Sequence, residues 1–127
     1  MTIAYWCVLA AIFLPYAFTG FAKFHGDFGP RQNHSPREFL DKLSGPRKRA
    51  HWAQLNSFEV TPGFMAAVII AHSIGTAAQS TIDMLALGFV VSRVLFGVVY
   101  IADIALLRTL VWSIGMAIIA ALFVISA

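Results

Sequence analysis

The sequence predicts an all-α integral membrane protein built as a bundle of four transmembrane helices. Of its 127 residues, 59% are hydrophobic and only 12% are charged, whereas about 25% are charged in a typical soluble domain. The mean hydropathy is +0.77. A small soluble domain could not bury this much apolar side chain, because much of its surface stays in contact with water. The composition also excludes a disordered chain, and the single cysteine excludes a disulfide scaffold.

The positions of the charges divide the chain into apolar segments. The first 22 residues carry no charge, ten of the 15 charges lie within the basic segment 23–49, and the last 19 residues are again uncharged. A transmembrane helix needs about 20 mostly apolar residues. We therefore treat the chain as one transmembrane domain over 1–127, with spans at about 3–22, 56–78, 82–106 and 109–126.

Local signals define the start of each helix. The first apolar run has no preceding positive charge and exceeds the length of a signal peptide's apolar region, so we expect a retained helix. Ser35 and Glu38 have the spacing of a capping box, which predicts a short helix in the basic segment. A helix beginning at Pro46 should continue into the second span. Asp83 is expected to lie in the first turn of the third span, where the helix dipole favours an acid.

The basic segment 23–49 also predicts the topology. It contains seven of the nine Lys and Arg residues, and such segments stay on the cytoplasmic side of the membrane. Four spans then place both termini on the non-cytoplasmic side. The segment supplies no basic face suited to a nucleic acid, so we expect no nucleic-acid partner.

Two polar clusters lie within or beside the spans, where ionisable residues are costly and indicate function. Glu59 and Arg93 are predicted to form a direct bidentate ion pair. The pair alone could serve only to hold the bundle together. The whole set predicts a cationic pocket open to the cytoplasm, suited to a small anionic ligand beside an apolar one. Its members are Arg49, Gln54, Asn56 and Glu59 on the second span, and Arg93, Tyr100 and Arg108 on the third, with Asp103 beside them without a role. We find no set of metal ligands.

These residues resemble the MAPEG family, the membrane-associated proteins in eicosanoid and glutathione metabolism. The resemblance rests on Arg49-Ala50, on Asn56-x-x-Glu59-x-x-Pro62, and on Arg93-x6-Tyr100 followed by Arg108. It covers nearly the whole chain. The segments 1–6 and 100–103 look most like a bacterial branch of the family, which implies a bacterial inner membrane.

The resemblance implies a homotrimer of four-helix subunits, with active sites between subunits on the cytoplasmic side and glutathione as co-substrate. It implies that Asn56 and Glu59 bind the backbone groups of glutathione with help from Gln54, and that Arg93 supports Glu59 or contacts the ligand. Tyr100 would donate a hydrogen bond near the thiol and Arg108 would stabilise the thiolate. Arg49 would add positive charge to the pocket. Tyr100 and Arg108 are thus the candidate catalytic residues.

Three functions remain open at this stage. The first is a glutathione-dependent transferase or peroxidase acting on small lipophilic electrophiles. The second is a non-enzymatic subunit that binds membrane lipid or serves as a scaffold. Trp52 and Phe96 favour the second, because the leukotriene-synthase branch has an arginine and a tyrosine at these positions. The third is a proton-coupled transporter using Glu59, ranked lowest because the flanking arginines would keep that carboxylate ionised.

Overall fold

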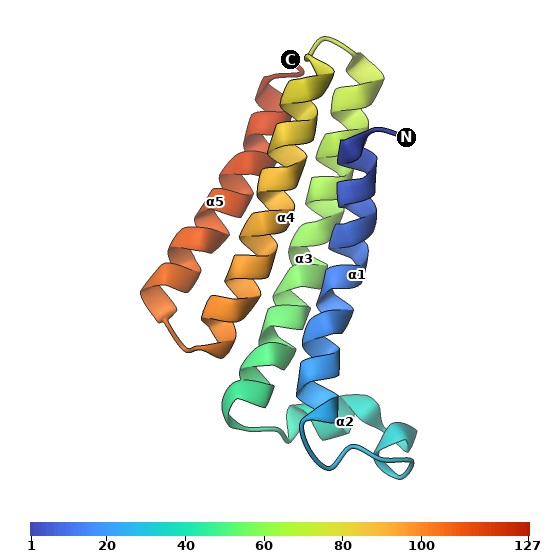
Figure 1. The fold of residues 1–127 in the computed structure, drawn as a ribbon, viewed down its shortest axis with the longest axis vertical. Helices are drawn as coiled ribbons and strands as arrows, with labels where there is room; N and C mark the ends of the chain where they lie inside the picture. Colours follow the sequence, from blue (N-terminus) through green and yellow to red (C-terminus); the bar gives the residue numbers. More distant parts are fainter.

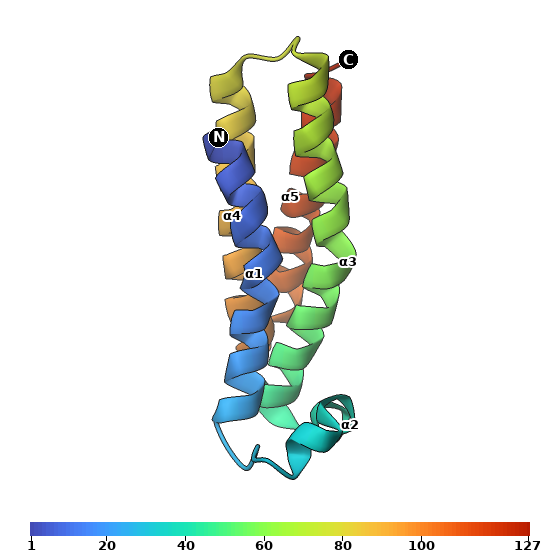
Figure 2. The ribbon, with the colours of Figure 1, turned by 90° about the vertical axis from the view of Figure 1, so that its right-hand side faces the viewer.

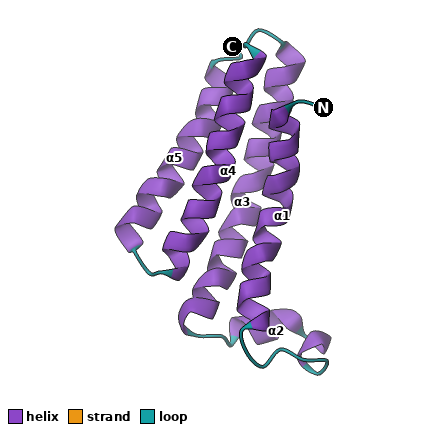
Figure 3. Ribbon diagram, viewed as in Figure 1, coloured by secondary structure: helices purple, strands orange, loops and turns teal.

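The computed structural model describes residues 1–127, and all of its regular structure is helical (Figure 3). A short 3-10 turn and the short helix α2 lie in the basic segment. The other four helices are each long and apolar enough to cross a membrane, which confirms the predicted fold class. The elements are α1 Ile3–Phe24, η1 Gln32–His34, α2 Pro36–Asp41, α3 Gly45–Ile74, α4 Gln79–Ile101 and α5 Ala105–Val124.

Helices α3 and α4 form the centre of the bundle, because they contact each other and each contacts both α1 and α5. Helices α1 and α5 lie on opposite sides of this central pair (Figures 1 and 2). Both termini lie at one end of the bundle, called here the terminal end (Figure 1). The basic segment and the α4–α5 turn lie at the other, called here the basic end. This arrangement is the one that four antiparallel spans predict.

The helix ends differ from the predicted spans where the backbone turns left-handed. Helix α3 begins at Gly45, so the helix predicted from Pro46 does continue into the second span. It ends at Ile74, earlier than expected, because Gly75 has a φ of 73° and its N–H bonds to the carbonyl of Ala71. Helix α4 ends at Ile101 instead of about residue 106, because Asp103 has a φ of 65°.

The capping box predicted in the basic segment does not form. Ser35 does precede α2, but its side chain makes no capping hydrogen bond. Glu38 instead accepts a hydrogen bond from Lys42, one helical turn further on. That hydrogen bond lowers the pKa of the Glu38 carboxyl below its usual value.

Asp83 has a different role from the predicted one, because it caps a neighbouring helix. Its carboxylate accepts the backbone N–H of Ala4, in the first turn of α1, at 2.8 Å, and the amide of Gln79 at 2.9 Å. Nearby, the hydroxyl of Thr2 lies 3.0 Å from Nε2 of His72. The negative charge at the start of α1 is favoured by the dipole of that helix, and the contact ties α1 to α4.

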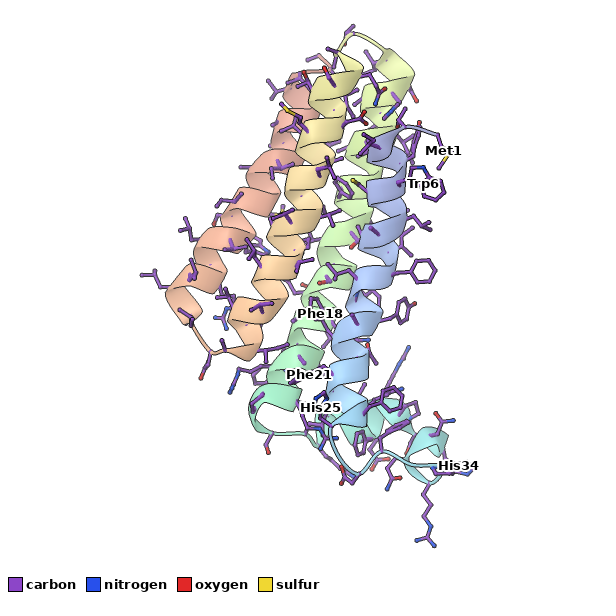
Figure 4. The ribbon with its side chains drawn as sticks, viewed as in Figure 1. Met1, Trp6, Phe18, Phe21, His25 and His34 are labelled. Carbon is purple, nitrogen blue, oxygen red and sulfur yellow. The ribbon has the colours of Figure 1, made fainter.

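The core is mainly apolar, and five of its six buried polar or charged side chains lie between the middle of the bundle and the basic end. The rings of Phe64 on α3 and Phe89 on α4 stack at a centroid distance of 3.9 Å, and both side chains are fully buried. On the outer surface large apolar side chains stay exposed, as Trp6 does on α1 (Figure 4). Such a surface is the one that a protein presents to lipid or to other transmembrane subunits.

Helix α1 packs tightly against α4 at Gly97, beside the candidate site. The ring of Phe18 packs directly on this glycine, and a methyl group there would overlap the ring. Phe18 lies between α1 and the inner helices (Figure 4). Small residues allow such close approach between transmembrane helices.

We therefore expect Gly97→Ala to destabilise the bundle by about 1–3 kcal/mol, the usual cost of overpacking a filled core. Reversible unfolding in detergent micelles measures the change. Gly88→Ala is the matched control on the same helix, because a methyl group at that position meets only ordinary contact with Ile118. Equal stabilities of the two variants would contradict the assigned packing.

Candidate functional site

The arginine on α4 is buried between helices with no carboxylate within ion-pair distance. Arg93 is only 2% exposed, and it forms no salt bridge. Its Nη2 donates to Oδ1 of Asn56 at 2.9 Å and to Oγ of Ser57 at 3.2 Å, both on α3. Its guanidinium carbon lies 4.0 Å from the centre of the Phe96 ring, a cation–π contact. Its Nε has no hydrogen-bond partner.

The predicted ion pair between Glu59 and Arg93 is therefore wrong, and Asn56 stands between the two groups. Its oxygen accepts from Arg93, and its Nδ2 donates to Oε2 of Glu59 at 3.3 Å. The glutamate lies one turn further along α3, and its side chain is exposed. The carboxylate therefore stays free for a ligand, while the amide links it to the buried cation.

Two adjoining hollows lie beside this chain of polar groups and share Asn56 and Tyr100. The first, called the Arg108 hollow, has a volume of about 260 Å³ and is lined by Asn56, Phe96, Tyr100, Arg108, Thr109 and Trp112. The second, called the Glu59 hollow, has a volume of about 430 Å³ and is lined by Trp52, Leu55, Asn56, Glu59 and Tyr100. Each combines apolar walls with a few polar groups, the usual character of a small-molecule site.

The two candidate catalytic residues lie in direct contact within the Arg108 hollow. The guanidinium carbon of Arg108 is 4.5 Å from the centre of the Tyr100 ring. The ring of Phe96 meets the ring of Tyr100 edge to face at a centroid distance of 5.4 Å, and the ring of Trp52 lies 6.4 Å from that of Tyr100. Arg108 pairs with no carboxylate. Its positive charge is therefore available to an anion in the hollow.

Arg49 does not line either hollow, although it shares a helix face with Asn56. Its Nε donates to the carbonyl oxygen of Ile101 at 2.9 Å, and its Nη1 lies 3.8 Å from Oδ2 of Asp103. Ile101 is the last residue of α4, and Asp103 lies in the α4–α5 turn. The structure thus places this arginine behind the site, against the turn that separates Tyr100 from Arg108.

Gln54 points to another face of α3. Its Oε1 lies 3.2 Å from Nδ1 of His51, which in turn is 3.5 Å from Asp41 on α2. These side chains line a separate hollow of about 360 Å³ together with Arg37, Leu40, Leu55 and Phe58. The structure does not bring Gln54 together with Asn56 and Glu59 within one subunit.

The structure also places in the site three residues that the sequence analysis did not select. Ser57 supplies the second oxygen to Arg93, and Thr109 and Trp112 complete the wall of the Arg108 hollow. The spacing of Trp112, four residues after Arg108, would have placed both on one helix face. Ser57 gave no comparable signal, because a serine on a helix usually bonds to the preceding turn, as this one also does to the carbonyl of Ala53.

The two adjoining hollows, together called the paired hollow, are lined by one guanidinium group (Arg108) and one carboxylate (Glu59), together with the amide of Asn56 and the phenol of Tyr100. Anionic and zwitterionic ligands suit such a set, because guanidinium groups bind carboxylates and thiolates, and a carboxylate binds ammonium and amide N–H groups. The flanking rings and the apolar outer surface of the bundle suit a lipophilic second ligand.

Comparison with known proteins gives a match at the level of family. The sequence profile of the MAPEG family matches residues 3–127. No curated protein and no solved structure matches the chain.

The link through Asn56 makes a measurable prediction about stability. Asn56→Ala should lower the free energy of unfolding by about 1–3 kcal/mol, because it removes an acceptor from a buried guanidinium. In the background of Arg93→Met the same substitution should cost clearly less, since no buried cation remains. Unfolding in detergent of both single variants and the double variant gives the coupling energy. A coupling energy of zero would show that the bond between Arg93 and Asn56 does not stabilise the bundle.

Proposed function

This chain belongs to the MAPEG family and is an integral, multi-pass membrane protein; we propose that it is a glutathione-dependent transferase or peroxidase for lipophilic electrophiles. The observation that supports this most directly is the unpaired guanidinium of Arg108 in contact with the Tyr100 ring. A cation and a phenol side by side at the edge of a membrane site are suited to binding a thiolate.

The proposed chemistry depends on ionising the thiol of glutathione. A free thiol has a pKa of about 8.5, so most of it is protonated at neutral pH. A fixed positive charge from Arg108 and a hydrogen bond from the hydroxyl of Tyr100 favour the thiolate. The thiolate sulfur then attacks an electrophilic carbon and a C–S bond forms. With an aryl halide the carbon–halogen bond breaks and halide leaves; with an activated double bond the π electrons move to the neighbouring carbon, which then takes up a proton. With a lipid hydroperoxide the thiolate attacks oxygen instead, and a second glutathione completes the reduction to an alcohol, water and a disulfide.

The other polar groups would hold the tripeptide. The free carboxylate of Glu59 suits an ammonium or amide N–H group, and Asn56, fixed by Arg93, suits a backbone amide. We also propose a homotrimer, as the family resemblance implies, with sites between subunits. Because Gln54 lies outside the paired hollow of its own subunit, any contact that it makes with glutathione would be in the site of a neighbouring subunit.

The proposed orientation places the basic end in the cytoplasm of a bacterial cell and both termini on the non-cytoplasmic side of the inner membrane. Cytoplasmic loops carry an excess of Lys and Arg, and seven of the nine lie between positions 23 and 49. Glutathione could then enter the paired hollow from the cytoplasm, and a lipophilic substrate from the bilayer.

A second candidate function is a non-enzymatic subunit that binds lipid at the same place. The Glu59 hollow favours it, because Trp52 and Leu55 give that hollow an apolar wall. Such a subunit would bind a lipid without ionising a thiol.

Thiolate absorbance near 240 nm distinguishes the two functions. Adding glutathione to the purified protein at neutral pH should produce the signal in the native chain but not in the Arg108→Ala variant. In Arg108→Ala, the conjugation of glutathione to a lipophilic aryl halide should slow by about 100-fold, which is the usual effect of removing a group that stabilises negative charge in an active site. Arg31→Ala is the control, because this exposed arginine lies far from the hollow in the basic segment.

Absence of both binding and thiolate in the native chain would reject the enzymatic function. A thiolate signal that survives in Arg108→Ala would leave the transferase function standing but would remove Arg108 from its assigned role.

A further inference from the structure

We propose that Arg49 and Asp103 are positioning residues that hold the α4–α5 turn and thereby keep Arg108 against Tyr100. The inference rests on the proposed function, since it concerns the same site. The ion pair crosses from α3 to the turn, and neither residue lines the paired hollow.

Hydrogen bonds from the turn and from α3 satisfy the carbonyl groups at the end of α4. The N–H groups of Asp103 and Ile104 bond to the carbonyls of Tyr100 and Val99, at 3.1 and 3.2 Å. This pattern is a Schellman motif, in which glycine normally occupies the left-handed position. The carbonyl of Ile101 is satisfied by Nε of Arg49 at 2.9 Å. The last turn of α4 therefore depends on a side chain from α3.

An aspartate occupies the left-handed position although glycine adopts it more easily. Asp103 has a φ of 65° and is the one residue other than glycine with a positive φ in the chain. Aspartate tolerates this conformation better than most side chains but less well than glycine. What aspartate adds is a carboxylate 3.8 Å from Arg49. We infer that the carboxylate is present for this contact and not for the turn itself.

The first turn of α5 has few other restraints. Ala105, Leu106 and Leu107 are exposed, Leu106 to 86%. Arg108 follows directly, with its N–H bonded to the carbonyl of Ile104 at 2.9 Å. The position of the Arg108 side chain over Tyr100 is therefore set mainly by the turn that connects the two helices.

Asp103→Gly separates a positioning role from a merely structural one, because the two predict opposite results. Glycine relieves the left-handed conformation, so the melting temperature should stay the same or rise. If the carboxylate positions Arg108, glutathione turnover should nevertheless fall by about 10- to 100-fold, as small misplacements of reacting groups do. The thiolate signal at neutral pH should fall with it. Asp103→Asn keeps the shape of the side chain but not its charge, so its turnover and thiolate signal should lie between those of the native chain and those of Asp103→Gly.

Hydrogen exchange provides a readout that does not depend on glutathione. The amides of Ile104 and Arg108, which donate to the carbonyls of Val99 and Ile104, should exchange faster in Asp103→Gly than in the native chain, while those of α3 stay unchanged. Gly75→Asp is the reciprocal control, since it puts an aspartate into the same backbone conformation at the terminal end. That variant should melt at a lower temperature and keep the native thiolate signal.

The outcomes separate this inference from the proposed function. If the native chain forms no thiolate, the proposed function fails, but faster exchange in Asp103→Gly would still support the role of the Arg49–Asp103 ion pair in holding the turn. Native turnover together with native exchange in Asp103→Gly would overturn the inference. Loss of the thiolate in Gly75→Asp would overturn it as well. The loss would then follow from destabilisation elsewhere in the bundle and would not depend on the contact between Arg49 and Asp103.

Discussion

A guanidinium group buried among membrane-spanning helices must find its hydrogen-bond acceptors within the protein, because lipid offers none. Arg93 meets this requirement at Nη2 alone, which donates to the α3 side chains Asn56 and Ser57, while its guanidinium carbon lies over the ring of Phe96 and its Nε has no partner. The contact sets how α4 lies against α3 near the basic end. It also turns Asn56 toward the hollow with a fixed orientation. The candidate site depends on this one buried cation for its geometry, even though the cation itself is 2% exposed.

The polar residues of α3 contact three different parts of the structure. Asn56 and Glu59 border the paired hollow, Arg49 supports the α4–α5 turn, and Gln54 faces His51 and α2. Successive side chains of an α-helix point about 100° apart around the helix axis, so residues that are neighbours in the sequence can face different parts of the structure. The site therefore has two layers. Asn56, Glu59, Tyr100 and Arg108 can touch a ligand, and the groups behind them keep those four in position.

The sequence predicted correctly that some of the site residues lie together, but it did not predict which polar groups pair. Asn56, Glu59, Tyr100 and Arg108 were expected together from helix periodicity and topology, and the structure does place them around adjoining hollows. The pairing of Glu59 with Arg93 was wrong, because periodicity does not specify which of two acceptors on one face a cation reaches. Asp83 was assigned to its own helix for a similar reason. Only the packing of α1 against α4 brings its carboxylate to the first turn of α1.

The amino-acid sequence was enough to predict the membrane class, the four spans, the end of the bundle that holds the basic segment and the family. Those properties depend on local composition and on the order of apolar runs and charges along the chain. The tertiary structure alone decided the partner of each buried polar group, the separation of Arg49 and Gln54 from the hollow, and the left-handed turn at Asp103. Those depend on how helices far apart in the sequence rotate and approach one another, as at Gly97 and Phe18. A hydrogen bond in a dry interior depends on shifts of about an ångström, and no spacing in the sequence specifies them.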